Sequence, residues 1–258
     1  MVEHAPLLAV SGLGAGYGSR RIVTDIDFIV APGTWFGLLG ANGSGKSTLL
    51  RAITGQIRLQ EGQVLVGGID IEKAPEQAKR HFGYAVDGAD LPEGLTGRQY
   101  LELVASIRGC RADDWPCGDL IEPLALGSWM GARIGDCSLG TRMKISLAGA
   151  LLSGPKLLIL DESLNGLDPV ANWRVRQILA KLVRSGRHAV ILSTHMVETV
   201  AASCTDVIFL EEGRITHRWT TEELRAAQGE AGGFDGLVVR ILEDAEAATQ
   251  KVRKDVLL

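Results

Sequence analysis

The chain has 258 residues and a mass of 27.6 kDa, and 46% of its residues are hydrophobic, which is enough to bury a large core. This composition excludes a disordered chain and predicts one large α/β domain, or such a domain with a small lobe. The net charge of −4 and the pI of about 5.8 give no overall positive field. Nucleic acid is therefore excluded as the main partner.

The cysteines and the apolar stretches indicate the compartment in which the chain is expected. The cysteines form no C-x-x-C pair and have no histidines at metal-binding spacing, so neither a zinc site nor a disulfide framework is predicted for Cys110, Cys117, Cys137 and Cys204. No apolar stretch reaches the roughly 18 to 20 residues of a membrane-spanning helix, and residues 1–6 lack the positive segment of a signal peptide. We expect a cytoplasmic chain unless a partner holds it at a membrane.

Residues 40–48, Gly-Ala-Asn-Gly-Ser-Gly-Lys-Ser-Thr, form an uninterrupted phosphate-binding loop with the spacing G-x-x-x-x-G-K-[ST]. An apolar run at 34–39 predicts a strand before the loop, and 46–56 is apolar-periodic and predicts a helix after it that Gly55 stops. The glycines let successive N–H groups face one anion, Lys46 adds a charge, and Ser47 can ligate Mg²⁺. The predicted nucleotide contacts are Gly40, Asn42, Gly43, Ser44, Gly45, Lys46, Ser47 and Thr48.

A second candidate anion site precedes a predicted helix in the middle of the chain. Met143, Leu147 and Leu151 mark one face of this helix, which Ser138 and Gly140 open. A serine hydroxyl and free backbone N–H groups at a helix N-terminus can bind an anion, but serine is also an ordinary helix cap, and both readings remain open here.

Two acidic residues follow the apolar run 156–160, which is typical of a strand buried on both faces of a parallel sheet. Asp161 and Glu162 would then lie at the carboxyl edge of the sheet, where open α/β sheets bind ligands. From there Asp161 can reach Mg²⁺ held by Ser47, and Glu162 can polarise a water for attack on the γ-phosphate. The alternative is a pair of solvated carboxylates at the end of a strand.

A third strand is predicted at 188–194 and ends at His195, which would fall on the same sheet edge as Asp161. A histidine in this place is often structural, but its imidazole can also contact the γ-phosphate or orient the water. Beyond 213–215 we expect a helix near 222–227 and an apolar run at 237–242, either a small appended lobe or a dimerisation element.

Taken together, residues 8–217 resemble the ATPase subunits of ATP-binding cassette (ABC) transporters. Residues 40–48 match the Walker A loop, 157–162 Walker B, 163–168 the D-loop and 137–141 the signature, while His195 matches the switch histidine and Tyr17 the aromatic that stacks on adenine. The signature departs from L-S-G-G-Q but keeps Ser138 and Gly140. The family's linker glutamine is replaced by Asp87, which can approach Mg²⁺ through a water.

The resemblance implies a phosphate-loop NTPase fold: a core of mostly parallel sheet with an antiparallel β subdomain and a helical subdomain at about 88–154. It implies an ABC ATPase domain at 1–217, a short C-terminal extension at 218–258, and ATP and Mg²⁺ as the bound groups. In such a subunit Glu162, His195 and Lys46 would be catalytic, and Ser47, Asp87 and Asp161 would hold the metal.

The partners implied are a separate transmembrane permease and a second ATPase subunit, identical or different, whose signature closes on the γ-phosphate. Residues 90–101 resemble the surface that contacts the permease, although an exposed helix entry capped by Thr96 explains them equally well. The signature and Asp87 favour the export type, at the inner face of the cell membrane. The alternative is a soluble ABC ATPase that acts as a mechanical switch without a membrane partner.

Overall fold

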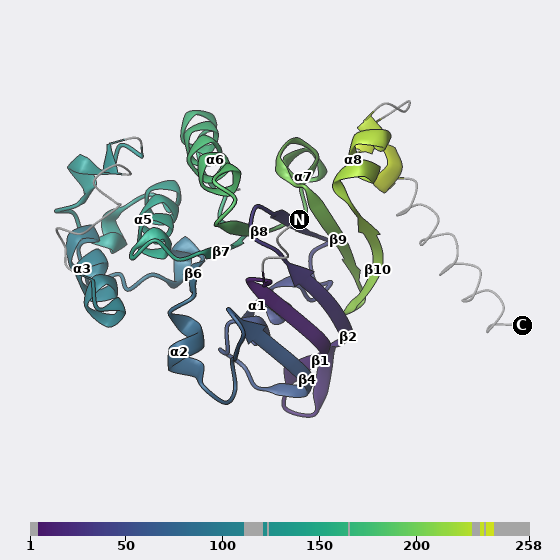
Figure 1. Cartoon of the computed structure of the whole chain (residues 1–258). Coiled ribbons are helices and arrows are strands. Elements are labelled where there is room, and N and C mark those ends of the chain that lie inside the picture. Colours follow the sequence, from purple (N-terminus) through teal and green to yellow (C-terminus); the bar gives the residue numbers. More distant parts are fainter. Residues whose placement is uncertain are drawn as a thin grey trace, which may run out of the picture.

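The computed structural model describes residues 5–110, 121–122, 124–164, 166–228, 233–234 and 236–239. Two sheets form its centre (Figure 1). The larger sheet has the order β10-β9-β3-β8-β7-β6, in which all neighbours are parallel except β9 and β10. Its strands are β3 (Trp35–Leu39), β6 (Phe82–Ala85), β7 (Leu157–Asp161), β8 (Ala189–Thr194), β9 (Asp206–Glu211) and β10 (Arg214–Trp219).

The smaller sheet is antiparallel and has the order β2-β1-β4-β5. Its strands are β1 (Leu8–Tyr17), β2 (Arg20–Val30), β4 (Leu59–Val66) and β5 (Ile69–Asp70). Helix α1 (Lys46–Ile53) lies between the two sheets, and the short α2 (Pro75–Lys79) follows β5 (Figure 1). These are the parallel core and the antiparallel β subdomain that the resemblance implied.

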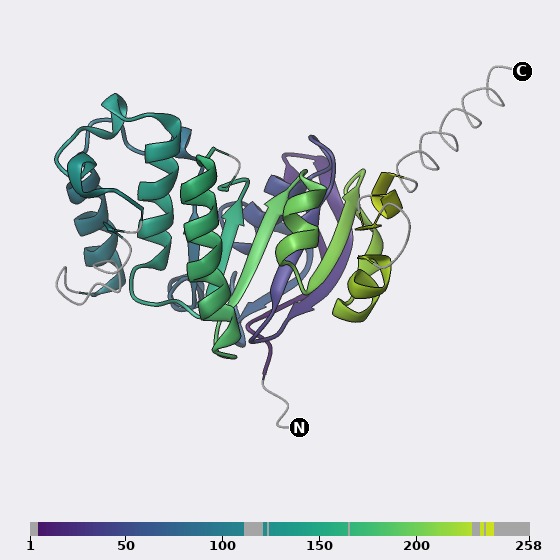
Figure 2. The ribbon, with the colours of Figure 1, turned by 90° about the horizontal axis from the view of Figure 1, so that it is seen from above.

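Helices α6 (Pro169–Arg184) and α7 (Val197–Ser203) cover the other face of the large sheet (Figure 2). Beyond β6, α3 (Gly97–Arg108) and α5 (Leu139–Leu151) stand beside each other as a helical layer (Figure 2). A short 3₁₀ turn at Gly88–Asp90 precedes α3, and 3₁₀ turns at Gly127–Trp129 and Ile134–Asp136 precede α5. At the opposite edge, α8 (Thr221–Gln228) follows β10. The fold is that of a phosphate-loop NTPase with a helical subdomain, as the resemblance implied.

Strand β7 shows why the apolar run before Asp161 becomes a central strand. Leu157 and Ile159 pack into a cluster with α1 and the small sheet, whereas Leu158 and Leu160 pack into a cluster with α5 and α6. All four side chains are fully buried, and each contributes about 1.5–3 kcal/mol of burial free energy. A strand covered on both faces needs apolar residues at every position, so the polar residues begin where the strand leaves the core.

Helix α1 stops at the glycine that the sequence predicted. It ends at Ile53, and Thr54 donates its hydroxyl to the carbonyl of Leu50 at 2.8 Å. Gly55 then takes a left-handed conformation (φ 65°), which ends the helix.

The tail follows its prediction where it is described. The helix expected near 222–227 is α8, and residues 236–239 are helical, while residues 240–242 of the apolar run lie outside the described residues. Trp219, Phe234 and Val238 pack with Leu39 and Val200 in one buried cluster. The first part of the tail therefore packs on the edge of the large sheet.

Candidate functional site

The phosphate loop has the backbone that a bound anion requires. It connects the end of β3 to α1, and Gly43 and Gly45 have φ angles of 83° and 108°, which favour glycine. A Cβ on Gly40 would lie 2.3 Å from the carbonyl oxygen of Leu210, so the loop passes too close to β9 for any side chain there. Helix α1 begins at Gly45 with no side-chain cap, so its first N–H groups face a ligand position.

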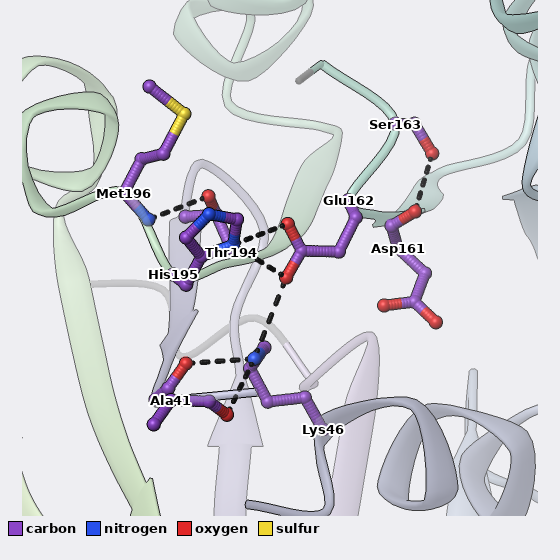
Figure 3. Close-up of polar contacts among 9 residues, drawn as sticks. Ala41, Lys46, Asp161, Glu162, Ser163, Thr194, His195 and Met196 are labelled. Atoms are coloured by element: carbon purple, nitrogen blue, oxygen red, sulfur yellow. Dashed lines mark hydrogen bonds and ion pairs between the residues drawn. The ribbon is translucent and has the colours of Figure 1, made fainter. Parts of the chain in front are cut away.

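Lys46 is buried, with 5% of its surface exposed, yet its charge is well partnered. Its Nζ donates hydrogen bonds to the carbonyl oxygens of Gly40 at 2.8 Å and Ala41 at 3.1 Å, and lies 3.5 Å from Oε1 of Glu162 (Figure 3). The loop thus holds the ammonium group at the sheet edge, beside the carboxylate that the sequence placed there.

Glu162 and His195 meet at the same edge from different strands. Nδ1 of His195 lies 3.2 Å from Oε2 of Glu162 (Figure 3). Glu162 has a left-handed φ of 53°, an uncommon conformation for this residue type, and its N–H donates to the carbonyl of Ser193. Such strain at a predicted reacting residue is typical of functional sites. Lys46, Glu162 and His195 are therefore brought together as predicted.

Asp161 has two carboxylate oxygens in different surroundings. Oδ2 lies 3.5 Å from the phenol oxygen of Tyr84, while Oδ1 is buried and has no hydrogen-bond partner. Burial, and then the charge of Asp161, raise the pKa of Tyr84 well above its usual value, so the phenol keeps its proton and donates. A buried acceptor without a hydrogen bond costs free energy, so the free Oδ1 indicates that a ligand binds there.

This donor set fits Mg²⁺, which takes one or two carboxylates together with hydroxyl, water and phosphate oxygens. The fit depends on the substrate phosphates, because no group of three His, Cys, Asp or Glu side chains that could hold a metal occurs among the described residues. Helix α1, which Lys46 and Ser47 open, packs against β7, whose last residue is Asp161.

Tyr17 ends β1 and is 47% exposed. Its phenol oxygen accepts a hydrogen bond from Nη1 of Arg51 at 3.1 Å, which also lowers the pKa of Tyr17. Arg51 is on α1, directly after the phosphate loop, so the ring is tethered close to the predicted nucleotide site with much of its surface available for stacking.

The predicted signature begins α5, as expected. Oγ of Ser138 accepts a hydrogen bond from the backbone N–H of Thr141 at 3.2 Å and lies 2.9 Å from its hydroxyl. A Cβ on Gly140 would lie 2.8 Å from the carbonyl oxygen of Gly166, so only glycine permits this approach. Asn165, in the predicted D-loop, lies outside the described residues.

An ion pair also joins the signature helix to the D-loop. Nζ of Lys144 lies 3.0 Å from Oδ2 of Asp168, whose other oxygen caps α6 through the N–H of Ala171.

Asp87 makes its side-chain contact within its own turn. Its Oδ1 accepts a hydrogen bond from the N–H of Ala89 at 2.9 Å and so caps the 3₁₀ turn that follows. This contact uses one carboxylate oxygen, and the predicted role at the metal stays a prediction.

Comparison with known proteins identifies the family. Residues 23–165 match the family described as ABC transporter. This chain belongs to that family.

A relative in Bacillus subtilis (strain 168), the uncharacterized ABC transporter ATP-binding protein YhcH, is 31% identical over 92% of this ABC ATPase and 76% of its own length. The Nod factor export ATP-binding protein I of Rhizobium etli is 33% identical over 79% of this chain and 65% of its own. A solved ATP-binding subunit of an ABC transporter superposes with a TM-score of 0.83 at 28% identity, covering 92% of this chain and 99% of that one.

The ABC ATPase therefore hydrolyses ATP and powers a transporter. Solved cassettes with this fold form dimers, and one is part of a transporter complex. In the described part of the ABC ATPase, no helix has both the length and the apolar character that crossing a membrane requires.

Sequence reasoning missed two side chains at this site, Tyr84 and Arg51. Each contacts a predicted site residue: Tyr84 contacts Asp161, and Arg51 contacts Tyr17. Tyr84 could have been found from its place in the strand before Asp87. Alternate residues of a strand share one face of the sheet, so a side chain of this strand could be expected to face the neighbouring strand's site residues. Nothing in the sequence indicated Arg51, because its partner Tyr17 lies 34 residues away, on a strand of the small sheet.

Proposed function

We propose that this ABC ATPase acts as a dimer that closes around two ATP molecules and drives an export-type transporter through a separate permease. The observation that carries the proposal is the convergence of Lys46, Glu162 and His195 at one sheet edge beside the phosphate loop. A buried cation, a strained carboxylate and an imidazole in contact are the parts that phosphoryl transfer to water needs.

Each side chain has a distinct role in this proposal. Lys46 binds the β- and γ-phosphates, together with the N–H groups of the loop and the side chains of Asn42, Ser44 and Thr48. Glu162 accepts the proton of the attacking water, and His195 holds that carboxylate in place and contacts the γ-phosphate. Tyr17 stacks on the adenine.

Ser47 and Asp161 would hold the metal, and Asp87 would approach it through a water. Mg²⁺, when bound, supplies charge neutralisation at the phosphate oxygens.

The dimer follows from the position of the signature. Helix α5 packs on β6, three strand positions from β3, which leads into the phosphate loop. Strands are spaced by about 4.8 Å, so the two elements are roughly 14 Å apart across the sheet. Ser138 and Gly140 would therefore complete the site of a second subunit, identical or different, and ATP would favour the closed state because it contacts both subunits.

A separate permease is the proposed membrane partner. We assign its contact to residues 90–101, where Thr96 and Gln99 form a capping box that starts α3. The chain would then be cytoplasmic and held at the inner face of the cell membrane. The name of the Rhizobium relative supports export rather than import.

We also propose the domain division suggested by the sequence, with an ABC ATPase domain at 1–217, a helical subdomain at about 88–154 and an extension at 218–258. The packing of Trp219 and Phe234 on the core supports an extension that is docked at its start.

Co-purification from the native membrane tests the transporter assignment. We expect the tagged chain to retain a multi-span membrane protein that stimulates its ATP hydrolysis. A chain that hydrolyses ATP but is recovered without any membrane protein would instead support the soluble switch.

A further inference from the structure

Tyr84 reaches the nucleotide site from a strand that carries no predicted site residue. Strands β6 and β7 are parallel, and Tyr84 is in register with Ile159, so its side chain lies on the same face of the sheet as that of Asp161, two residues further along. Two residues of a strand span about 6.6 Å, which is the reach of a tyrosine ring. The phenol oxygen accordingly lies 3.5 Å from Oδ2 of Asp161.

Tyr84 lines the same cavity as Gln56 and Thr54, at the end of α1. The Gln56 amide donates to Oγ1 of Thr54 at 2.9 Å, and Thr54 is almost fully buried. The wall behind Tyr84 is therefore built on the helix that follows the phosphate loop.

The contact leaves the two oxygens of the Asp161 carboxylate in different surroundings. Oδ2 faces the phenol, and Oδ1 is the buried atom without a partner. A carboxylate fixed at one oxygen can present the other in a single direction, which is how groups behind a metal ligand orient it.

We propose that Tyr84 is a positioning residue for Asp161: its phenol O–H holds Oδ2 so that Oδ1 is presented to the metal. This inference rests on the proposed metal role of Asp161. The competing explanation is that Tyr84 only forms the wall of the cavity of about 510 Å³ that it lines with Phe82 and Arg108.

Nucleotide affinity with and without metal separates these explanations. The full chain is titrated with a non-hydrolysable ATP analogue in Mg²⁺ and, separately, in EDTA. The ratio of the Kd in EDTA to the Kd in Mg²⁺ reports how much the metal strengthens binding. Three variants are compared with the wild type: Tyr84→Phe, Asp161→Asn and the control Tyr100→Phe. Tyr100 is a suitable control because it is a partly buried tyrosine whose ring packs against Gly149 in the helical subdomain.

We expect Tyr84→Phe to weaken binding in Mg²⁺ by about 3- to 10-fold, at or below the usual effect of removing a group behind a metal ligand. Binding in EDTA should stay at the wild-type value, which also shows that the variant is folded. Asp161→Asn should reduce the ratio further, and Tyr100→Phe should leave it unchanged.

Three results would overturn the inference in distinguishable ways. A wild-type ratio for Tyr84→Phe beside a reduced ratio for Asp161→Asn would reject the positioning role and leave the metal role of Asp161 intact. A wild-type ratio for Asp161→Asn would reject the metal role, and the inference with it. Equal weakening of Tyr84→Phe in Mg²⁺ and EDTA would mean that the hydroxyl supports the fold rather than the metal ligand.

Discussion

His195 contacts Glu162 through Nδ1, 3.2 Å from Oε2, across the ends of two neighbouring strands. The contact fixes a carboxylate whose backbone is already in an uncommon conformation, so its direction depends on the imidazole. We expect His195→Ala to lower kcat for ATP hydrolysis by about 100-fold, within the range of general acid–base effects, with little change in ATP affinity. Steady-state hydrolysis and calorimetric binding check this, and an unchanged kcat would remove His195 from the mechanism.

Lys46 provides the second prediction. Its buried Nζ is held by two loop carbonyls, so Lys46→Ala removes the cation placed at the phosphates. We expect tight ATP binding to disappear in calorimetric titration. Lys73→Ala is the control, because Lys73 is exposed and pairs with Asp70 on the small sheet. Equal ATP affinity in the two variants would reject the site assignment.

Ser138 and Thr96 allow stability and function to be separated. Each caps a helix of the helical subdomain with a 3.2 Å hydrogen bond, from Thr141 to Ser138 and from Gln99 to Thr96. We expect Ser138→Ala and Thr96→Ala each to lower the free energy of unfolding by about 1 kcal/mol. Denaturant unfolding checks this.

The two variants should differ in ATP-dependent dimerisation, which only Ser138→Ala should impair. If both variants dimerise like the wild type, Ser138 is a helix cap alone.

The sequence predicted those parts of the site that depend on local spacing. Lys46, Asp161 and Glu162 follow apolar runs that have to be strands, and parallel strands end at one edge, so their meeting was predictable. The contact of Tyr84 with Asp161 was not, because the two residues are 77 positions apart in the sequence and their contact depends on the register between β6 and β7. The end of α1 was predictable, because Gly55 readily takes the left-handed conformation that terminates a helix.

Asp87 gives the fourth prediction. Asp87→Asn keeps an oxygen that can accept from the N–H of Ala89 and removes only the charge, whereas Asp87→Ala removes both. If the charge acts at the metal, both variants should lose stimulation of ATP hydrolysis by the reconstituted permease while retaining ATP affinity. Normal stimulation in Asp87→Asn alone would reduce the role of Asp87 to capping, and normal stimulation in both would leave it without a role in coupling.

The shared ATP site is tested most directly by the mass of Glu162→Gln in solution. The amide keeps the shape of the carboxylate but cannot accept the proton of the attacking water, so ATP stays bound and the closed dimer accumulates. Light scattering with ATP and Mg²⁺ should give about twice the monomer mass of 27.6 kDa, and the monomer mass without ATP. Adding Lys46→Ala to this variant should abolish the dimer. Glu162→Gln that binds ATP and Mg²⁺ yet remains a monomer would contradict the shared site.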